Sequence, residues 1–267
     1  MALGAASKTA QASLALMLTA FGAACSAHAS PWARADGELL IISHAEYFYS
    51  DLTSQDPRGG RFESLDTDTY IEFGVTDDVT IGGKAIYGTS WLTNSAGTFT
   101  DTGFSEIEGY AQYQFARTIK HAASLRLSAG KPAAFQASAR QAINNGADVE
   151  LAALYGRNLT FAPLKTFTAV EVGYRKRFGA GADVIRSQVT LGAEPSQHWL
   201  LLLEGFSTVS LRNEKPGGAD YDIVKIQPSL VYRINRRWAV QAGMNEEVTG
   251  RNLALGRTFF IGLWSAF

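Results

Sequence analysis

The sequence predicts an all-β protein, a transmembrane antiparallel up-and-down β-barrel of about 12 strands. Apolar and polar residues alternate with a period of two from Gly37 onward, which is typical of strands with two different faces. Turn-forming residues separate the alternating segments. The composition agrees, with 46% hydrophobic residues, 18% charged residues and 26 glycines. Lys+Arg number 24 and Asp+Glu 25, and this balance argues against a nucleic-acid-binding protein, which needs an excess of basic side chains.

Residues 1–29 have the features of a secretory signal peptide. They contain one charged residue, Lys8, then an apolar stretch, and end in Ala27-His28-Ala29. Small residues before the cleavage point are typical of such signals, so we expect cleavage after Ala29. A short helix packed on the domain and lipidation at Cys25 are the alternatives.

Cleavage after Ala29 would divide the rest of the chain into two parts. Residues 30–36 would form a periplasmic N-terminal segment and residues 37–267 the outer-membrane barrel. The mature chain would have no cysteine, because Cys25 is the single one in the sequence. A disulfide or a cysteine metal site is then excluded.

The clearest pair of strands lies between Tyr70 and Gly88. Ile71, Phe73 and Val75 share one face, and Tyr70 and Glu72 share the other. The turn 76–78 follows, and the alternation then resumes up to Gly88, which predicts a hairpin. The first strand of the chain is expected near 38–49 and the last near 258–267.

A membrane barrel explains this alternation better than a soluble sandwich. The polar faces carry small residues and charges of both signs, which suits a confined lumen. Aromatic residues lie at strand ends, where barrels have interfacial girdles: Tyr87, Trp91, Tyr155, Tyr174, Trp199, Tyr232 and Trp238. We therefore expect the apolar faces to contact lipid of a Gram-negative outer membrane.

The lengths of the gaps predict the topology. Short gaps at 76–78, 195–198 and 235–237 mostly alternate with longer ones at 50–61, 94–102, 132–147 and 212–220. This alternation is typical of short periplasmic turns facing long extracellular loops. The gap 158–166 is long for a turn and 179–183 is short for a loop, so ten strands remain an alternative.

Charged residues on the polar faces are the candidate lumen lining. They are Glu46, Glu72, Lys84, Glu106, Glu108, Arg126, Glu150, Glu171, Arg175, Arg186, Glu194, Glu204, Lys225 and Arg233. A strongly ion-selective pore would favour one sign, because rings of like charge attract the opposite ion. The mixture has two interpretations. The charges pair across strands and fill a narrow interior, or they line a weakly selective path for a neutral or zwitterionic solute.

The sequence predicts no enzyme. His44 is the best candidate for a general base, but Ser43 beside it lies on the opposite face of the same strand. His121 and His198 fall in predicted turns. The histidines show no ligand spacing for a metal, and no glycine-rich phosphate loop precedes a helix, so we expect no cofactor.

Several segments resemble XagA-like outer-membrane barrels of Gram-negative bacteria, which are associated with biofilm exopolysaccharide. They are VEVGYRKRFG (170–179), WLLLLEGFSTVSL (199–211), DYDIVKIQPSLVYRI (220–234) and GRTFFIGLWSAF (256–267). The segment YIEFGVTDDVTIGGKAIYG (70–88) is similar more widely, including to outer-membrane transporters of aromatic-degradation operons. The resemblance implies a barrel that works with polysaccharide synthesis or export proteins, but it identifies no catalytic or binding residue.

The last strand resembles the signal that the barrel insertion machinery recognises. Phe267 corresponds to its terminal aromatic residue, and Phe259, Ile261 and Leu263 continue the spacing. Ser265 interrupts the pattern where an apolar residue is usual.

Three functions follow as hypotheses. The first is a polar lumen that assists passage or surface retention of an exopolysaccharide or a small hydrophilic solute. The second is a structural or adhesive barrel that contacts extracellular polymer through the loops 50–61 and 132–147. The third is an uptake channel for small aromatic or apolar compounds, for which Leu40, Ile42 and Phe48 are the only hint on the inward face.

Overall fold

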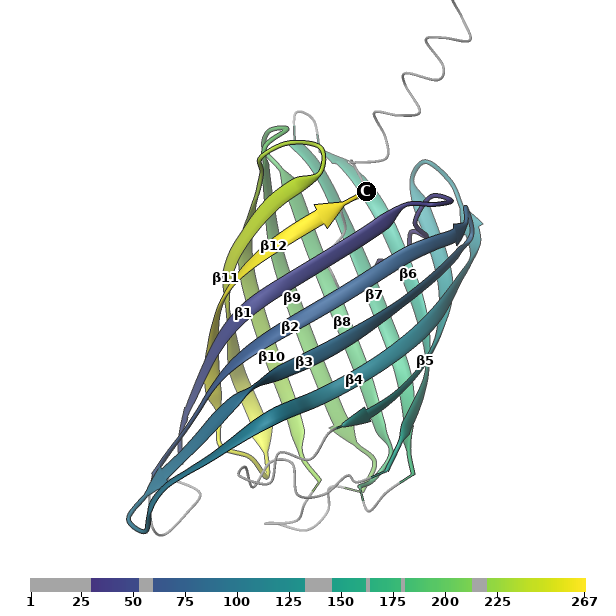
Figure 1. Ribbon diagram of the computed structural model, residues 1–267. Coiled ribbons are helices and arrows are strands. Elements are labelled where there is room, and N and C mark those ends of the chain that lie inside the picture. Colours follow the sequence, from purple (N-terminus) through teal and green to yellow (C-terminus); the bar gives the residue numbers. More distant parts are fainter. Residues whose placement is uncertain (1–29, 53–59, 133–145, 162–163, 179–180, 213–219) are drawn as a thin grey trace, which may run out of the picture.

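Twelve antiparallel strands close into one barrel in a computed structural model of the chain (Figure 1). The structure describes residues 30–52, 60–132, 146–161, 164–178, 181–212 and 220–267. Each strand pairs with its neighbours in the sequence, and β1 pairs with β12 to complete the ring. The predicted fold is therefore confirmed with twelve strands, and the ten-strand alternative is wrong. No helix in the described ranges is long and apolar enough to cross a membrane.

The strands have the following bounds: β1 Leu39–Asp51, β2 Arg61–Thr76, β3 Val79–Asn94, β4 Gly97–Arg117, β5 His121–Pro132, β6 Asp148–Phe161, β7 Leu164–Arg177, β8 Val184–Glu194, β9 Trp199–Ser210, β10 Asp222–Arg233, β11 Trp238–Arg251 and β12 Gly256–Ala266.

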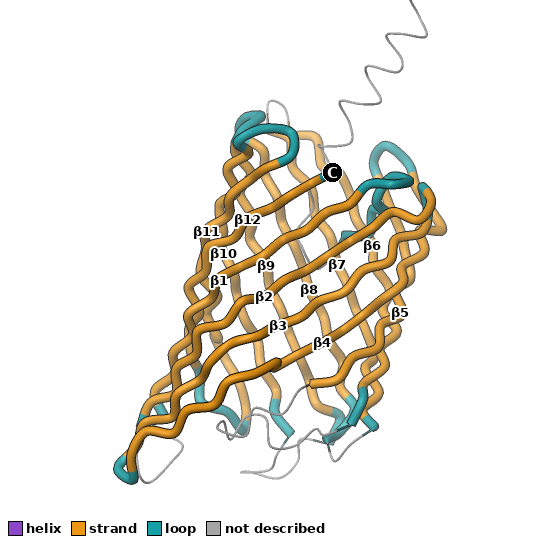
Figure 2. The backbone as a smooth tube through the Cα atoms, in the orientation of Figure 1, coloured by secondary structure: helices purple, strands orange, loops and turns teal. Residues whose placement is uncertain are grey.

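The two ends of the barrel differ. At one end, which we call the terminal end, β1 begins and β12 ends, and short connections join β2 to β3, β8 to β9 and β10 to β11 (Figure 2). At the opposite end, the loop end, β1 connects to β2 and β5 to β6 through longer segments. Within these connections, residues 53–59 and 133–145 lie outside the described residues, as do residues 213–219 between β9 and β10.

The barrel closes where the two ends of the described chain meet. The backbone N–H of Leu39 donates to the carbonyl of Phe267 at 3.0 Å, and the N–H of Phe267 donates back at 2.8 Å. Phe259, Ile261 and Leu263 point outward on β12, and Phe267 is also exposed, whereas Ser265 is buried. Recognition of these residues by the insertion machinery stays a prediction.

The outer face of the barrel is apolar. Ile71 and Phe73 on β2 are 42% and 40% exposed, whereas Tyr70 and Glu72, which alternate with them, are 5% and 3% exposed. Aromatic rings gather on the outer face at the terminal end, where Trp199 and Tyr232 lie 4.7 Å apart between ring centroids. A closed sheet satisfies its backbone groups internally, so such a face can contact lipid without exposing unpaired N–H or C=O groups.

Two segments that the sequence predicts to be gaps between strands belong largely to strands in the structure. The prediction of a loop at 94–102 is wrong, because β3 and β4 continue to a tight turn. They pair from Thr89–Thr102 to Asn94–Gly97. The β-branched threonines of this stretch favour strand, and Thr93 and Thr98 pair through their hydroxyls at 3.1 Å. The gap 158–166 shortens likewise, since β6 and β7 pair as far as Phe161 and Leu164.

The β3–β4 hairpin gives the barrel an uneven rim. β4 has 21 residues and β3 has 16, whereas β8 and β12 have 11 each. At the loop end this hairpin extends beyond the strands on the opposite side of the barrel (Figure 1).

The candidate channel lumen

The polar faces of the strands enclose a cavity of about 510 Å³. Its lining includes most of the charged residues that the sequence singled out: Glu46, Lys84, Glu106, Glu108, Arg126, Glu150, Glu171, Arg175, Arg186 and Lys225. The other four make inward contacts elsewhere. Glu72 contacts Arg34, Glu194 pairs with Arg233 at 2.8 Å, and Glu204 accepts a hydrogen bond from Gln227.

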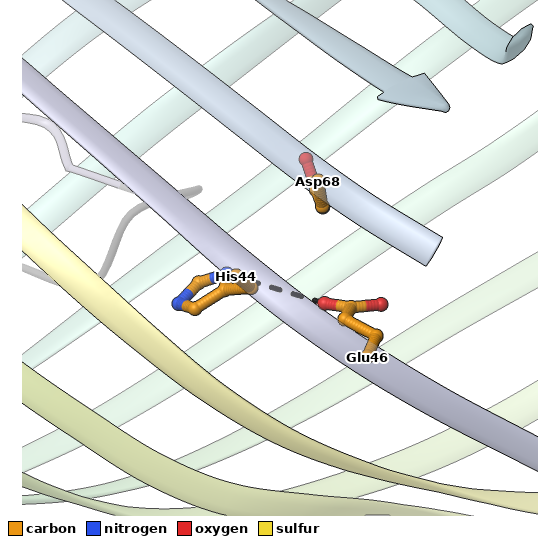
Figure 3. A group of neighbouring side chains, drawn as sticks. All are labelled: His44, Glu46 and Asp68. Carbon is orange, nitrogen blue, oxygen red and sulfur yellow. Dashed lines mark ion pairs between the residues drawn. The ribbon is translucent and has the colours of Figure 1, made fainter. Parts of the chain in front are cut away.

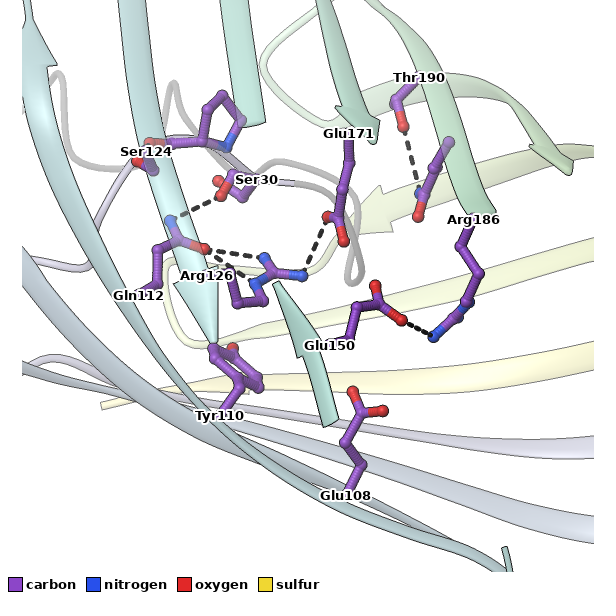
Figure 4. Close-up of polar contacts among 12 residues, drawn as sticks. Ser30, Glu108, Tyr110, Gln112, Ser124, Arg126, Glu150, Glu171, Arg186 and Thr190 are labelled. Carbon is purple, nitrogen blue, oxygen red and sulfur yellow. Dashed lines mark hydrogen bonds and ion pairs between the residues drawn. The ribbon is translucent and has the colours of Figure 1, made fainter. Parts of the chain in front are cut away.

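Arg175 on β7 is the centre of a large ionic cluster in the cavity. Its guanidinium donates to Glu150 at 2.6 Å and to Glu108, and Glu106 lies 3.9 Å away. Arg186 on β8 reaches the same Glu150 carboxylate at 3.2 Å (Figure 4). These contacts join four strands, β4, β6, β7 and β8, across the interior, so paired charges occupy part of the lumen.

A second cluster surrounds Arg126 on β5. The guanidinium donates twice to Gln112 Oε1, at 2.9 and 3.1 Å, and contacts Glu171 at 3.0 Å (Figure 4). It also lies 4.7 Å from the centroid of the Tyr110 ring, a cation–π arrangement. Every one of these side chains comes from an inward position of its strand, and Tyr110, Arg126 and Glu171 line the cavity.

Residues Ser30 to Arg34 lie inside the barrel next to the Arg126 cluster, and we call this segment the plug. Its backbone carbonyls accept hydrogen bonds from the wall: Gln112 Nε2 donates to Ser30 at 2.9 Å, and Gln114 Nε2 donates to Pro31 at 3.0 Å. The plug residues are all buried, with Trp32 8% and Ser30 3% exposed. The segment that the sequence placed before the barrel therefore contacts the inner wall at the terminal end.

One carboxylate anchors the plug. Arg34 Nε donates to Glu72 Oε2 at 2.5 Å, and the other Glu72 oxygen accepts from Tyr70 at 2.6 Å and Tyr110 at 2.8 Å. The backbone N–H of Arg34 also donates to Thr80 Oγ1 at 2.9 Å. A buried charge with this many donors is well compensated, so the contact holds the segment firmly.

An apolar layer surrounds the plug at the terminal end. Trp32 packs edge-to-face on Phe167, with ring centroids 6.4 Å apart. The same cluster contains further inward side chains: Leu40, Ile42, Ala169, Leu200, Leu202, Val231 and Trp264. Leu40, Ile42 and Phe48 are therefore not the only hint of an apolar lining, because further apolar residues point inward on β7, β9, β10 and β12.

His44 lies inward, as its position on the strand requires, and its Nε2 donates to Gln241 Oε1 at 3.0 Å. Ser43 faces the other way, with its hydroxyl 3.2 Å from that of Thr69. The two side chains lie on opposite faces of β1, so they do not form a nucleophile and base pair.

A group of potential metal ligands lies near His44. His44, Glu46 and Asp68 each offer one ligand atom, and these atoms all lie within 4.8 Å of one another. Sequence spacing did not reveal the group, because Asp68 comes from β2 and meets His44 through the strand register. The signal that could have revealed the group is the register of the predicted first and second strands, because it places Asp68 opposite His44.

The sequence matches no family model and no curated protein. Its fold is shared with solved outer-membrane barrels. An outer-membrane channel from Pseudomonas putida F1 superposes with a TM-score of 0.64 and 10% identity, covering 88% of this chain and 97% of the channel. The NanC porin superposes with a TM-score of 0.56 and 8% identity, covering 84% and 98%.

The translocator domain of the autotransporter NalP from Neisseria meningitidis is also similar, with a TM-score of 0.54 and 11% identity over 98% of this chain and 97% of that domain. Channels, porins and autotransporter translocators thus share this architecture. At such low identities the likeness shows the fold, and the function has to come from the lumen itself.

Proposed function

We propose that the chain is an outer-membrane channel for small hydrophilic solutes, with the plug closing its terminal end. The observation that supports this proposal most strongly is a polar cavity of about 510 Å³ inside a barrel whose outer face is apolar. Cavities of roughly 300–1,000 Å³ are typical for small-molecule ligands, so the space suits a mono- or disaccharide-sized solute. The location follows from this proposal: a Gram-negative outer membrane, after cleavage at Ala29.

The charges of the lining favour neutral or zwitterionic solutes. Acidic residues such as Glu108 and Glu150 are paired with basic residues such as Arg175 and Arg186. Pairing leaves no ring of one sign to attract a counter-charged ion, so ion selectivity should be weak. The paired groups still offer many hydrogen-bonding atoms to a solute with hydroxyl groups.

Passage of an exopolysaccharide, which the XagA-like resemblance implies, would need one further step. An extended polymer requires a continuous path, and Trp32 and Arg34 interrupt the path at the terminal end. We therefore propose small solutes as the primary cargo and polymer passage only with the plug displaced, for example by synthesis or export proteins in the periplasm. Apolar cargo is less favoured, since the plug occupies the apolar layer.

A second candidate is contact with extracellular polymer at the rim. The long β3–β4 hairpin supports it, because the hairpin carries Thr89, Thr93, Thr98 and Thr102, whose paired hydroxyls form a polar ladder. The sequence predicts such contact through the loops 50–61 and 132–147, which lie mostly outside the described residues.

Solute passage can be tested by swelling of proteoliposomes in isosmotic sugars. Ala152 lines the cavity and its neighbour Ala153 faces outward, so the two positions provide a matched pair. In a chain lacking residues 30–35, Ala152→Trp should slow swelling several-fold, and Ala153→Trp should leave the rate unchanged. Equal rates for the two variants, or no swelling above empty vesicles, would contradict the proposal.

A further inference from the structure

His44, Glu46 and Asp68 gather on the inner wall where β1 and β2 pair (Figure 3). His44 and Asp68 are direct partners across the two strands. Glu46 is the next inward residue of β1, and its Oε1 lies 4.0 Å from His44 Nδ1. Glu46 and Asp68 line the cavity, so the group is reached from the lumen.

The imidazole of His44 is held with Nδ1 facing the Glu46 carboxylate. Trp264 Nε1 donates to Gln241 Oε1 at 2.9 Å, and Gln241 Nε2 donates to Ser229 Oγ at 2.9 Å. An indole N–H can only donate, so the amide oxygen of Gln241 must face Trp264 and, with it, His44 Nε2 at 3.0 Å. Nε2 therefore carries the proton, and in the neutral ring the lone pair lies on Nδ1.

The ring position is fixed by packing as well. Phe260 contacts the imidazole edge-to-face at 5.2 Å between centroids. Gly262 pairs with His44 across β1 and β12, and a Cβ at this glycine would overlap the imidazole. The barrel thus provides a fitted space for the ring. A histidine whose far nitrogen donates to an oxygen is the usual arrangement of a metal ligand.

Asp68 supplies an oxygen that has no partner. Its side chain is 4% exposed, and Oδ1 is buried with no hydrogen-bond partner in the described structure. The second oxygen, Oδ2, is 3.3 Å from Lys84 Nζ, which orients the carboxylate. A buried acceptor without a donor is costly, by roughly 1–3 kcal/mol, and a bound cation would remove that cost.

We propose that His44, Glu46 and Asp68 form a binding site for a divalent transition-metal ion such as Zn²⁺. One imidazole nitrogen and two carboxylate oxygens are ligands that Zn²⁺ accepts, and the remaining coordination positions face the lumen, where water or a solute can bind. Mg²⁺ and Ca²⁺ prefer oxygen ligands alone and should bind more weakly.

The charges and the geometry of the site are compatible with an ion. Glu106 is shared between Lys84 and Arg175, and Lys84 is the ion-pair partner of Asp68, so the two carboxylates of Glu46 and Asp68 together keep an excess of negative charge for a divalent cation to neutralise. Zinc–ligand bonds of about 2.0–2.2 Å require ligand atoms closer together than the present spacing of up to 4.8 Å. The carboxyl group of Glu46 is 27% exposed and can swing towards Nδ1.

Zinc binding can be measured by isothermal titration calorimetry on the folded full-length chain in detergent. One ion per barrel is expected, and His44→Ala and Asp68→Asn should each weaken binding at least tenfold. The controls His121→Ala and His198→Ala, which change histidines at the terminal end, should bind like the unchanged protein. Because binding does not depend on conduction, this result is independent of the proposed channel function.

Two further variants keep the test decisive if His44→Ala fails to fold. Glu46→Gln alters a partly exposed ligand, and Gln241→Met alters the residue that positions the imidazole. Each should weaken zinc binding about tenfold or more, with the barrel folded as judged by heat-modifiable electrophoretic mobility. Co²⁺ should also give visible absorption bands of a low-symmetry site that His44→Ala abolishes. No binding by the unchanged protein, or binding that survives all ligand variants, would overturn the proposal.

Discussion

Arg175 shows how single residues hold the lumen together. It contacts carboxylates from two strands, Glu106 and Glu108 of β4 and Asp148 and Glu150 of β6. The sequence placed most of these side chains on the inner face, because alternation fixes the direction in which a strand residue points. It did not predict which charges meet, because that depends on the register between strands.

Arg175→Ala should lower the free energy of unfolding by about 3 kcal/mol, since it leaves several buried carboxylates without their main partner. The measurement is urea-induced unfolding in phospholipid vesicles, followed by tryptophan fluorescence. The control is Lys176→Ala, which removes an exposed ion pair with Asp183 of 2.9 Å and should cost less than about 1 kcal/mol.

The ion pair between Lys176 and Asp183, which the control variant removes, is ionised at neutral pH. Hydrogen bonds from Tyr174, Lys176 and the backbone of Arg177 lower the pKa of Asp183, in the loop after β7, to about 2. A lowered carboxyl pKa adds stability that is lost only as the pH falls through that value, so neutral pH leaves the pair intact. Equal losses of stability in Arg175→Ala and Lys176→Ala would contradict the account of the cluster.

The fit of the plug depends on Gly156, which has no side chain where the plug packs against β6. A Cβ at this inward position of β6 would overlap Pro31 and the ring of Trp32. Gly156→Ala should therefore displace the plug and increase the swelling rate of proteoliposomes in sugars. Gly103→Ala is the matched control, because a Cβ there meets no atom within 4 Å. Equal rates for the two variants would show that the plug does not limit passage.

At the scale of the element, alternation predicted the strands well and the loops less well. The stretch 94–102 has several small and polar residues, and composition alone favours a loop there. The structure makes it strand, because Thr98, Thr100 and Thr102 alternate with Phe99 and pair with β3. The two strands of a hairpin lie close together in the sequence, so their pairing can continue towards the turn wherever β-branched residues favour the strand conformation.

The β3–β4 hairpin should be dispensable for the barrel. Deleting residues 90–93 and 98–101 removes four residues from each strand and keeps the turn 94–97, so the inward and outward alternation is preserved. The shortened chain should still show heat-modifiable mobility and unchanged sugar swelling. If the rim contacts polymer, polysaccharide binding should fall while swelling persists. Loss of folding would contradict the assignment of the hairpin to the rim.

At the scale of the whole molecule, the plug is the feature that the sequence did not reveal. Ser30 to Arg34 have no alternation long enough to predict a strand, and their partners come from strands spread over the first half of the barrel and from Phe167. Such contacts exist only once the barrel is closed. The whole structure therefore combines a charged cavity with an N-terminal segment buried at the terminal end, and we expect conduction to depend on whether the plug is seated.

Single-channel recording in planar bilayers tests this dependence most directly, by comparing the chain 30–267 with the chain 36–267. We predict rare, small and short-lived conductance steps for the first, and larger, long-lived steps with weak ion selectivity for the second. Silence from both chains, or identical steps from both, would contradict the account of a polar channel closed by its own N-terminal segment.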